Sequence, residues 1–273
     1  MITPRDLDVD FAPVPRHWLA GNAAATAVSN GVSLLFPHGE RFFVRAVKHF
    51  LDRIDDPGLR AQVKGFFGQE GRHAREHERF NEILRRQGFE IDRFLETYDR
   101  ISRWIEARTP PKLRLAVTAA CEHFTAIMAE GAFQGPLLEL SAPEMQALLA
   151  WHAAEEIEHK AVAYDVLQRI DPSYRLRVGG LAMATVMLGG FWLWAATLLL
   201  RQDGLRWPAA LRQLRALHAA GGGDPRREAI IRRVFGRGIR EYLRRDFHPS
   251  QLPNEDLAAA WFAAHGLAMP EAA

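Results

Sequence analysis

Apolar residues recur along much of the chain at every third or fourth position, the spacing of helices that bury one face. This pattern predicts long helices over about residues 36–54 and 57–87, from residue 110 to beyond residue 129, and over 143–170. No segment alternates apolar and polar residues over a useful length, so strands are not expected. We therefore expect an all-α protein whose long helices form a four-helix bundle.

The expected helix ends carry local signals. Pro37 suits a first helical turn, where its missing N–H costs nothing. Asp56 is a candidate N-cap, and Gly88 suits the position after a helix C-terminus. Ser141 and Glu144 have the spacing of a capping box, in which the serine hydroxyl accepts from the first-turn backbone. Residues 1–30 read as an extended lead-in with a short helix at most.

An uncharged run over residues 178–200 differs from the rest of the chain and is long enough to cross a bilayer. It is open to three interpretations: a membrane span, an in-plane apolar element, or a helix buried in a homodimer. An arginine-rich helix is expected after Pro225. Our first interpretation is that its arginines form a solvated face, and our second is that they contact anionic lipid headgroups. We expect three parts: a metal-binding bundle over residues 1–172, a hydrophobic helical segment over residues 173–204, and a basic C-terminal helical region over residues 205–273.

Composition narrows the function classes. The chain has 273 residues and a net charge of +2, and no known motif accompanies its arginines, so no nucleic-acid partner is expected. The single cysteine, Cys121, excludes an intrachain disulfide and a thiolate zinc site. The first residues lack the apolar stretch of a signal peptide. These features predict a cytoplasmic protein, with the inner face of the cytoplasmic membrane as an alternative location.

Carboxylates and imidazoles interrupt the apolar faces of the four long helices. Residues three apart on a helix share a face, so each Glu-x-x-His motif offers an oxygen and a nitrogen to one point. Isolated motifs of this kind are common on solvated helix faces, but two copies on apolar stripes are not. The predicted metal ligands are Glu40, Glu70, His73, Glu122, Glu156 and His159.

This order of ligands, one Glu and then Glu-x-x-His, repeated once, is that of ferritin-like dinuclear carboxylate bundles. The fold class is therefore refined to a ferritin-like four-helix bundle. Carboxylate and imidazole donors favour two iron ions, with manganese or a mixed Mn/Fe pair as the alternative. Bound cations would also remove the cost of burying four carboxylates together.

A third imidazole would join this set. His152 lies four residues before Glu156 on the same face, and His77 lies four residues after His73. We favour His152 as the ligand and keep His77 as the rival, or as a residue that supports a ligand. With His152, the pattern over about residues 36–165 resembles that of di-iron arylamine N-oxygenases, whose site carries three His and four Glu.

A second resemblance covers nearly the whole chain. The runs 36–43, 68–73, 154–160 and 246–249 look like those of a bacterial family of predicted metal-dependent hydrolases. That resemblance implies hydrolysis at a dinuclear metal site. It conflicts with the N-oxygenase resemblance, which implies that iron activates dioxygen.

From the ligand chemistry we predict an O2-activating di-iron oxidoreductase that acts on a small or lipid-like organic substrate. Its electron donor is not identified by the sequence. The main alternative is a metal-dependent hydrolase. A further alternative is a non-catalytic ferritin-like metal-binding protein.

Overall fold

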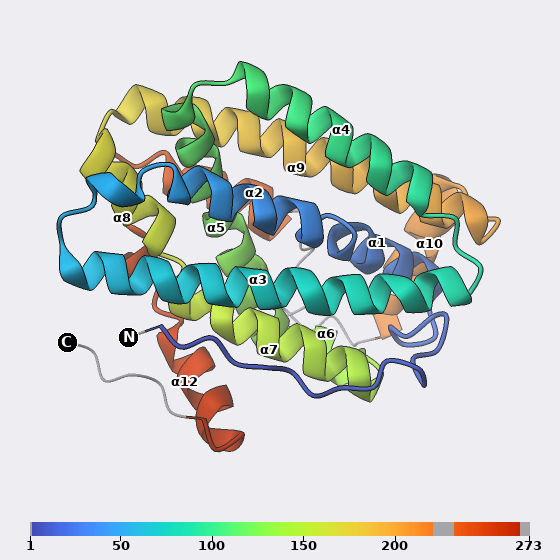
Figure 1. Ribbon diagram of the computed structural model, residues 1–273. Helices are drawn as coiled ribbons and strands as arrows, with labels where there is room; N and C mark the ends of the chain where they lie inside the picture. Colours follow the sequence, from blue (N-terminus) through green and yellow to red (C-terminus); the bar gives the residue numbers. More distant parts are fainter. Residues whose placement is uncertain (1, 221–231, 268–273) are drawn as a thin grey trace.

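Helices make up almost all of the regular structure in the computed structural model, which describes residues 2–220 and 232–267 (Figure 1). Within these residues the extended pairing is limited to one isolated bridge between Leu19 and Ser141. The predicted all-α class is confirmed. Residues 2–22 form the expected extended lead-in, which runs along the lower edge of the molecule in Figure 1.

Four helices enclose the centre of the protein: α2 (Phe36–Lys48), α3 (Pro57–Arg86), α5 (Pro111–Gln134) and α7 (Pro143–His159). Helix α2 packs on α3 and α5, and α7 packs on α5 and α3. Each of the four therefore turns one face toward the same interior. That this arrangement is a ferritin-like bundle stays a prediction.

The local signals at the helix ends are mostly confirmed. The Asp56 carboxylate accepts from the Leu59 N–H at the start of α3, and Gly88 follows the end of α3 with a φ of +87°. The prediction of a capping box is wrong, because Ala142 is the N-cap of α7 and no side chain caps this helix. The Ser141 hydroxyl instead donates to a backbone carbonyl of the preceding turn.

The helix expected over residues 143–170 is broken in two. Helix α7 ends at His159, and α8 (Val162–Ile170) follows after a short gap. The buried Lys160 ammonium donates to the Asn254 Oδ1 atom at 2.6 Å, and also to the carbonyl of residue 252 and the carboxylate of residue 255. These tertiary bonds hold the chain at the break. They also engage the Asn254 side chain, which makes no capping bond to the helix that follows it.

A second group of helices covers one side of the central four: α1 (Ala23–Ser33), α4 (Asp92–Arg108), α9 (Tyr174–Gln202) and α10 (Trp207–Ala220). Helix α9 contains the uncharged run and packs on α1 and α5. It is the one helix in the described residues that is long and apolar enough to cross a membrane. That property alone is weak support for a span, because core helices of soluble proteins share it.

The C-terminal region is helical where it is described. The remaining elements are η1 (Leu51–Arg53), α6 (Leu137–Leu140), the π-helical η3 (Arg232–Gly238), α11 (Ile239–Tyr242), η4 (Pro249–Gln251) and α12 (Glu255–Ala264). Helix α12 packs against α7, and η3 packs against α5. The expected start of the arginine-rich helix, at Pro225, lies outside the described residues. The three-part division of the chain stays a prediction.

Candidate metal centre

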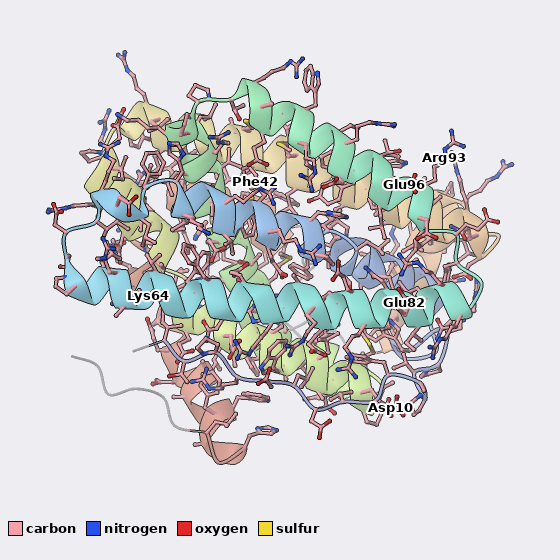
Figure 2. All side chains as sticks on the ribbon, in the orientation of Figure 1. Asp10, Phe42, Lys64, Glu82, Arg93 and Glu96 are labelled. Atoms are coloured by element: carbon pink, nitrogen blue, oxygen red, sulfur yellow. The ribbon has the colours of Figure 1, made fainter. Side chains whose placement is uncertain are left out.

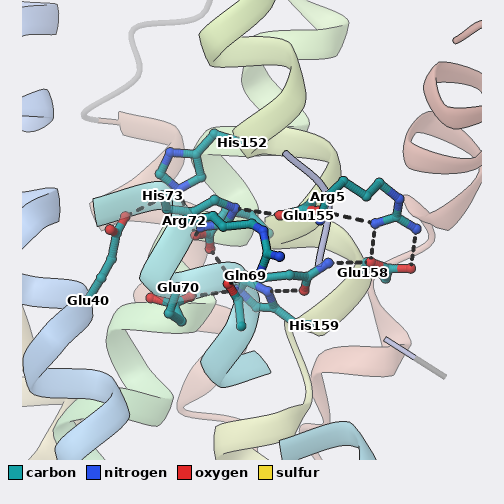
Figure 3. A network of polar contacts seen from close by, with 12 residues as sticks. Arg5, Glu40, Gln69, Glu70, Arg72, His73, His152, Glu155, Glu158 and His159 are labelled. Atoms are coloured by element: carbon teal, nitrogen blue, oxygen red, sulfur yellow. Dashed lines mark hydrogen bonds and ion pairs between the residues drawn. The ribbon is translucent and has the colours of Figure 1, made fainter. Parts of the chain in front are cut away.

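The predicted ligands from all four central helices converge in the interior. Every one of these side chains is buried, with at most 5% of it exposed. Figure 3 shows Glu40 and His152 on one side of the cluster, with Glu70 and His159 on the other. The residues brought together are Glu40 from α2, Glu70 and His73 from α3, Glu122 from α5, and His152, Glu156 and His159 from α7.

One group of possible metal ligands consists of Glu40, His73, His152 and Glu156, whose ligand atoms lie within 4.8 Å of one another. The His152 Nε2 atom lies 2.8 Å from Glu156 Oε1 and 3.6 Å from Glu40 Oε1. The His73 Nδ1 atom lies 3.7 Å from the same Glu156 oxygen. Two carboxylates and two imidazoles therefore surround one point.

A second group consists of Glu70, Glu156 and His159, within the same 4.8 Å limit. The His159 Nε2 atom lies 3.1 Å from Glu70 Oε1 and 3.6 Å from Glu156 Oε2. Glu122 adds an oxygen 3.3 Å from that nitrogen. Glu156 belongs to both groups and presents a different oxygen to each, which is the position of a bridging carboxylate.

The far nitrogens of the imidazoles are held by outer partners. His73 Nε2 lies 3.0 Å from Glu155 Oε2, and His159 Nδ1 lies 2.9 Å from Gln69 Oε1. Such bonds fix the ring orientation of a histidine, so that its other nitrogen faces the cluster and is available to a metal ion. Glu155 is itself held by the Arg5 guanidinium, which reaches it from the lead-in at 3.2 Å (Figure 3).

His152 and His77, the two rivals for the third imidazole, occupy different positions. His152 belongs to the first group, whereas His77 lies behind it, with His77 Nε2 2.8 Å from His152 Nδ1. His77 Nδ1 in turn lies 2.8 Å from the Ser33 hydroxyl. The geometry thus fits His152 as a ligand and His77 as its outer partner. The ligand roles of all seven residues stay predictions.

Burial and crowding set the protonation of the metal-free cluster. Burial, followed by repulsion from neighbouring carboxylates, raises the pKa of Glu40 and of Glu70 well above the ordinary value. Burial also raises the pKa of Glu122 to about 7. Burial opposes ionisation of Glu156 too, but His159 and His152 outweigh it and lower its pKa. Without cations, the cluster therefore holds protons that metal ions would displace.

The cluster also leaves polar atoms without hydrogen-bond partners. Both carboxylate oxygens of Glu40, Glu70 and Glu122 lack one, as do His73 Nδ1 and His159 Nε2. Buried groups of this kind are costly unless something satisfies them. Carboxylate oxygen and imidazole nitrogen are donors for divalent first-row metal ions, so the residues present fit such a group.

A buried Glu/His cluster within an all-α fold defines a metal-binding protein, and comparison with known families agrees. Residues 3–252 match the family described as predicted metal-dependent hydrolase, and the chain belongs to that family. The expected oxygenase activity is therefore wrong, because the description of the family points to metal-dependent hydrolysis, the alternative kept from the sequence. No curated protein and no solved structure matches the chain.

Sequence reasoning named His77 as a residue that could support a ligand, but it missed the other outer partners. Gln69 and Glu155 are each adjacent to a predicted ligand, and that adjacency was the available signal. Arg5 and Ser33 carry no comparable signal, because tertiary packing brings them to the site. Arg5 comes from the lead-in, and Ser33 is the last residue of α1.

Proposed function

We propose that this protein is a metal-dependent hydrolase that binds two divalent ions and cleaves a small organic substrate. The observation that carries this proposal is the pair of buried ligand groups joined by Glu156. Membership of the hydrolase family supports it. The oxygen and nitrogen donors favour manganese or iron(II) as the ions.

The proposed ligand assignment follows the two groups. The first ion would bind Glu40, His73 and His152, and the second would bind Glu70, Glu122 and His159, with Glu156 between them. Two carboxylates or more at each ion would balance its positive charge. This balance would stabilise so many acidic groups in one core.

Bound ions would supply Lewis acidity, which polarises the bond to be cleaved and lowers the pKa of water. In the hydrolysis, water oxygen bonds to the electrophilic carbon or phosphorus, the bond to the leaving group breaks, and a water proton passes to the leaving group. The chain's own contribution is orientation. Glu155, Gln69 and His77 hold three imidazoles in place, while Trp151 and Phe66 pack on His73 and His159 and keep out bulk water.

Access to this buried cluster requires side-chain movement. Phe36 is half-buried, and its ring lies 4.5 Å from the His152 ring and 4.7 Å from the His77 ring. It thus reaches from near the surface to the first ligand group. We propose that substrate enters where the Phe36 side chain now packs.

The test begins with protein stripped of metal by a chelator and reloaded separately with Mn²⁺, Fe²⁺ or Zn²⁺. Hydrolysis of p-nitrophenyl esters, p-nitrophenyl phosphates and anilides is then followed by absorbance. We expect activity only after reloading, with a substrate class that the screen identifies. Glu156→Gln should lose the activity, whereas Glu96→Gln, an exposed change on α4, should keep it. Hydrolysis that survives chelation, or that survives Glu156→Gln, would overturn the proposal.

A further inference from the structure

The outward face of α9 is apolar over about four turns. Its most exposed large residues are Val186, 74% exposed, and Leu193, 56% exposed. Exposed Arg175 and Arg201 flank this face at the two ends of α9. Five of the exposed residues between them recur every three or four positions and form one stripe along the helix: Gly179, Ala182, Val186, Gly190 and Leu193. Trp194, 39% exposed, lies beside the end of this stripe.

Helix α4 widens this stripe into a face. The Phe94 ring lies 4.8 Å from the Trp194 ring, and the Tyr98 ring lies 4.6 Å from the Phe191 ring, so α4 runs antiparallel to α9. Figure 1 shows the two helices together on the side of the molecule away from α12. These two ring pairs align the helices so that Trp104, further along α4, lies beside the middle of α9. Trp104 is 56% exposed. We call the exposed surface of these two helices the α4–α9 face.

The charges around the α4–α9 face are mainly positive. Three of the four acidic residues of α4 already pair with arginines in the structure. Arg93 and Arg100 make no ion pair within the described residues, and Arg93 points outward from α4 (Figure 2). The exposed arginines of α4 and α9 are Arg93, Arg100, Arg103, Arg108, Arg175 and Arg201.

The opposite side of α9 packs closely against α5 and α1. A Cβ atom added at Gly180 would lie 2.5 Å from the Ala116 backbone of α5, and one at Gly31 of α1 would lie 3.0 Å from the Ala196 backbone. The Trp192 indole N–H donates to the Val28 carbonyl at 2.8 Å. If α9 crossed a membrane, it would lose its packing on both α5 and α1. The packing therefore favours an α9 that stays on the body of the protein.

We propose that the α4–α9 face docks on an anionic phospholipid bilayer, with α9 in the plane of the membrane. Val186, Leu193 and Trp194 would enter the headgroup–acyl boundary, and Trp104 would lie at the headgroup level, where indole rings are favoured. The surrounding arginines would meet the lipid phosphates. This proposal is independent of the hydrolase activity, because none of these residues belongs to the metal cluster.

The test uses the full-length protein and flotation with two vesicle preparations: phosphatidylcholine alone, and phosphatidylcholine mixed with phosphatidylglycerol. We expect binding to the mixed vesicles, with release by high salt or alkaline carbonate. The double variant Val186→Glu/Leu193→Glu should lower the partition coefficient at least tenfold, and Arg93→Gln/Arg100→Gln should lower it by about fivefold per charge. Ala260→Glu, a change at an exposed position on α12, is the control and should bind normally.

Circular dichroism and light scattering complete the design. The Glu variants replace exposed side chains, so their helical signal should match that of the parent protein. Binding that resists carbonate would indicate a span and overturn the in-plane arrangement. Absence of binding, or binding unchanged by the double variant, would overturn the docking site. If the double variant instead converts a dimer to a monomer and vesicles never bind, the face is an interface between two copies of the chain.

Discussion

Replacement of Glu122 by Gln should have opposite effects on the metal-free and metal-loaded protein. Glu122 is buried on α5, with its Oε2 atom 3.3 Å from His159 Nε2. Burial, which is only partly offset by His159, raises the pKa of its carboxyl to about 7. Glutamine keeps the shape and an acceptor oxygen but cannot ionise. It therefore removes the cost of a buried charge together with a proposed metal ligand.

The magnitude follows from the linkage between protonation and folding. A pKa raised from 4.5 to about 7 means that the folded state holds the proton more tightly than the unfolded chain does. The resulting penalty is absent below the ordinary carboxyl pKa, grows as the pH rises toward 7, and is complete above it. It amounts to about 3 kcal/mol in the free energy of unfolding. For a chain of this length, that energy corresponds to a change of about 5 °C in Tm.

Calorimetry on chelator-treated protein measures this effect. Glu122→Gln should raise the Tm at about pH 8 and leave it nearly unchanged at about pH 5, where the parent carboxyl is protonated in the folded state. Added Mn²⁺ should raise the Tm of the parent protein more than that of the variant. Glu96→Gln, which is exposed, should change neither. A lower Tm for metal-free Glu122→Gln at about pH 8, or an equal rise at both pH values, would refute the reasoning.

Three further changes test other contacts. Arg5→Ala leaves the buried carboxylates of Glu155 and Glu158 without their cation, so urea titration should show a loss of about 3 kcal/mol in the free energy of unfolding. No loss would contradict a stabilising role for these two ion pairs. His77→Phe keeps a ring in place but removes the partner of His152, so calorimetric titration should show one ion bound at least about tenfold more weakly and the other unchanged. Gly180→Val should destabilise by about 1–3 kcal/mol because its Cβ meets backbone, whereas Gly179→Ala, with open space around it, should stabilise slightly.

The ligand-bearing faces were readable from the sequence because helical spacing ties residue number to direction. On α3 the buried stripe through Glu70, His73 and His77 follows this spacing throughout. Spacing could not choose between His77 and His152, since each shares a face with a Glu-x-x-His motif. That choice depends on how far α3 and α7 are rotated toward each other, which the tertiary packing sets.

Contacts between distant segments account for the other differences. The break after His159 has no local cause in the sequence, because it depends on the bonds between Lys160 and residues 252–255. The position of Arg5 likewise depends on how the lead-in docks. The reaction type was mispredicted for a chemical reason: the same oxygen and nitrogen donors serve hydrolysis and oxygen activation. Ligand identity alone does not separate the two.

Helix α7, which carries three of the proposed ligands, is held by residues from both ends of the chain. Arg5 binds its outer carboxylates, and Lys160 at its C-terminus is held by the segment around Asn254. During synthesis on the ribosome, Asn254 emerges long after all seven cluster residues have been made. The bonds that hold the C-terminus of α7 can therefore form only after all seven cluster residues have been synthesised.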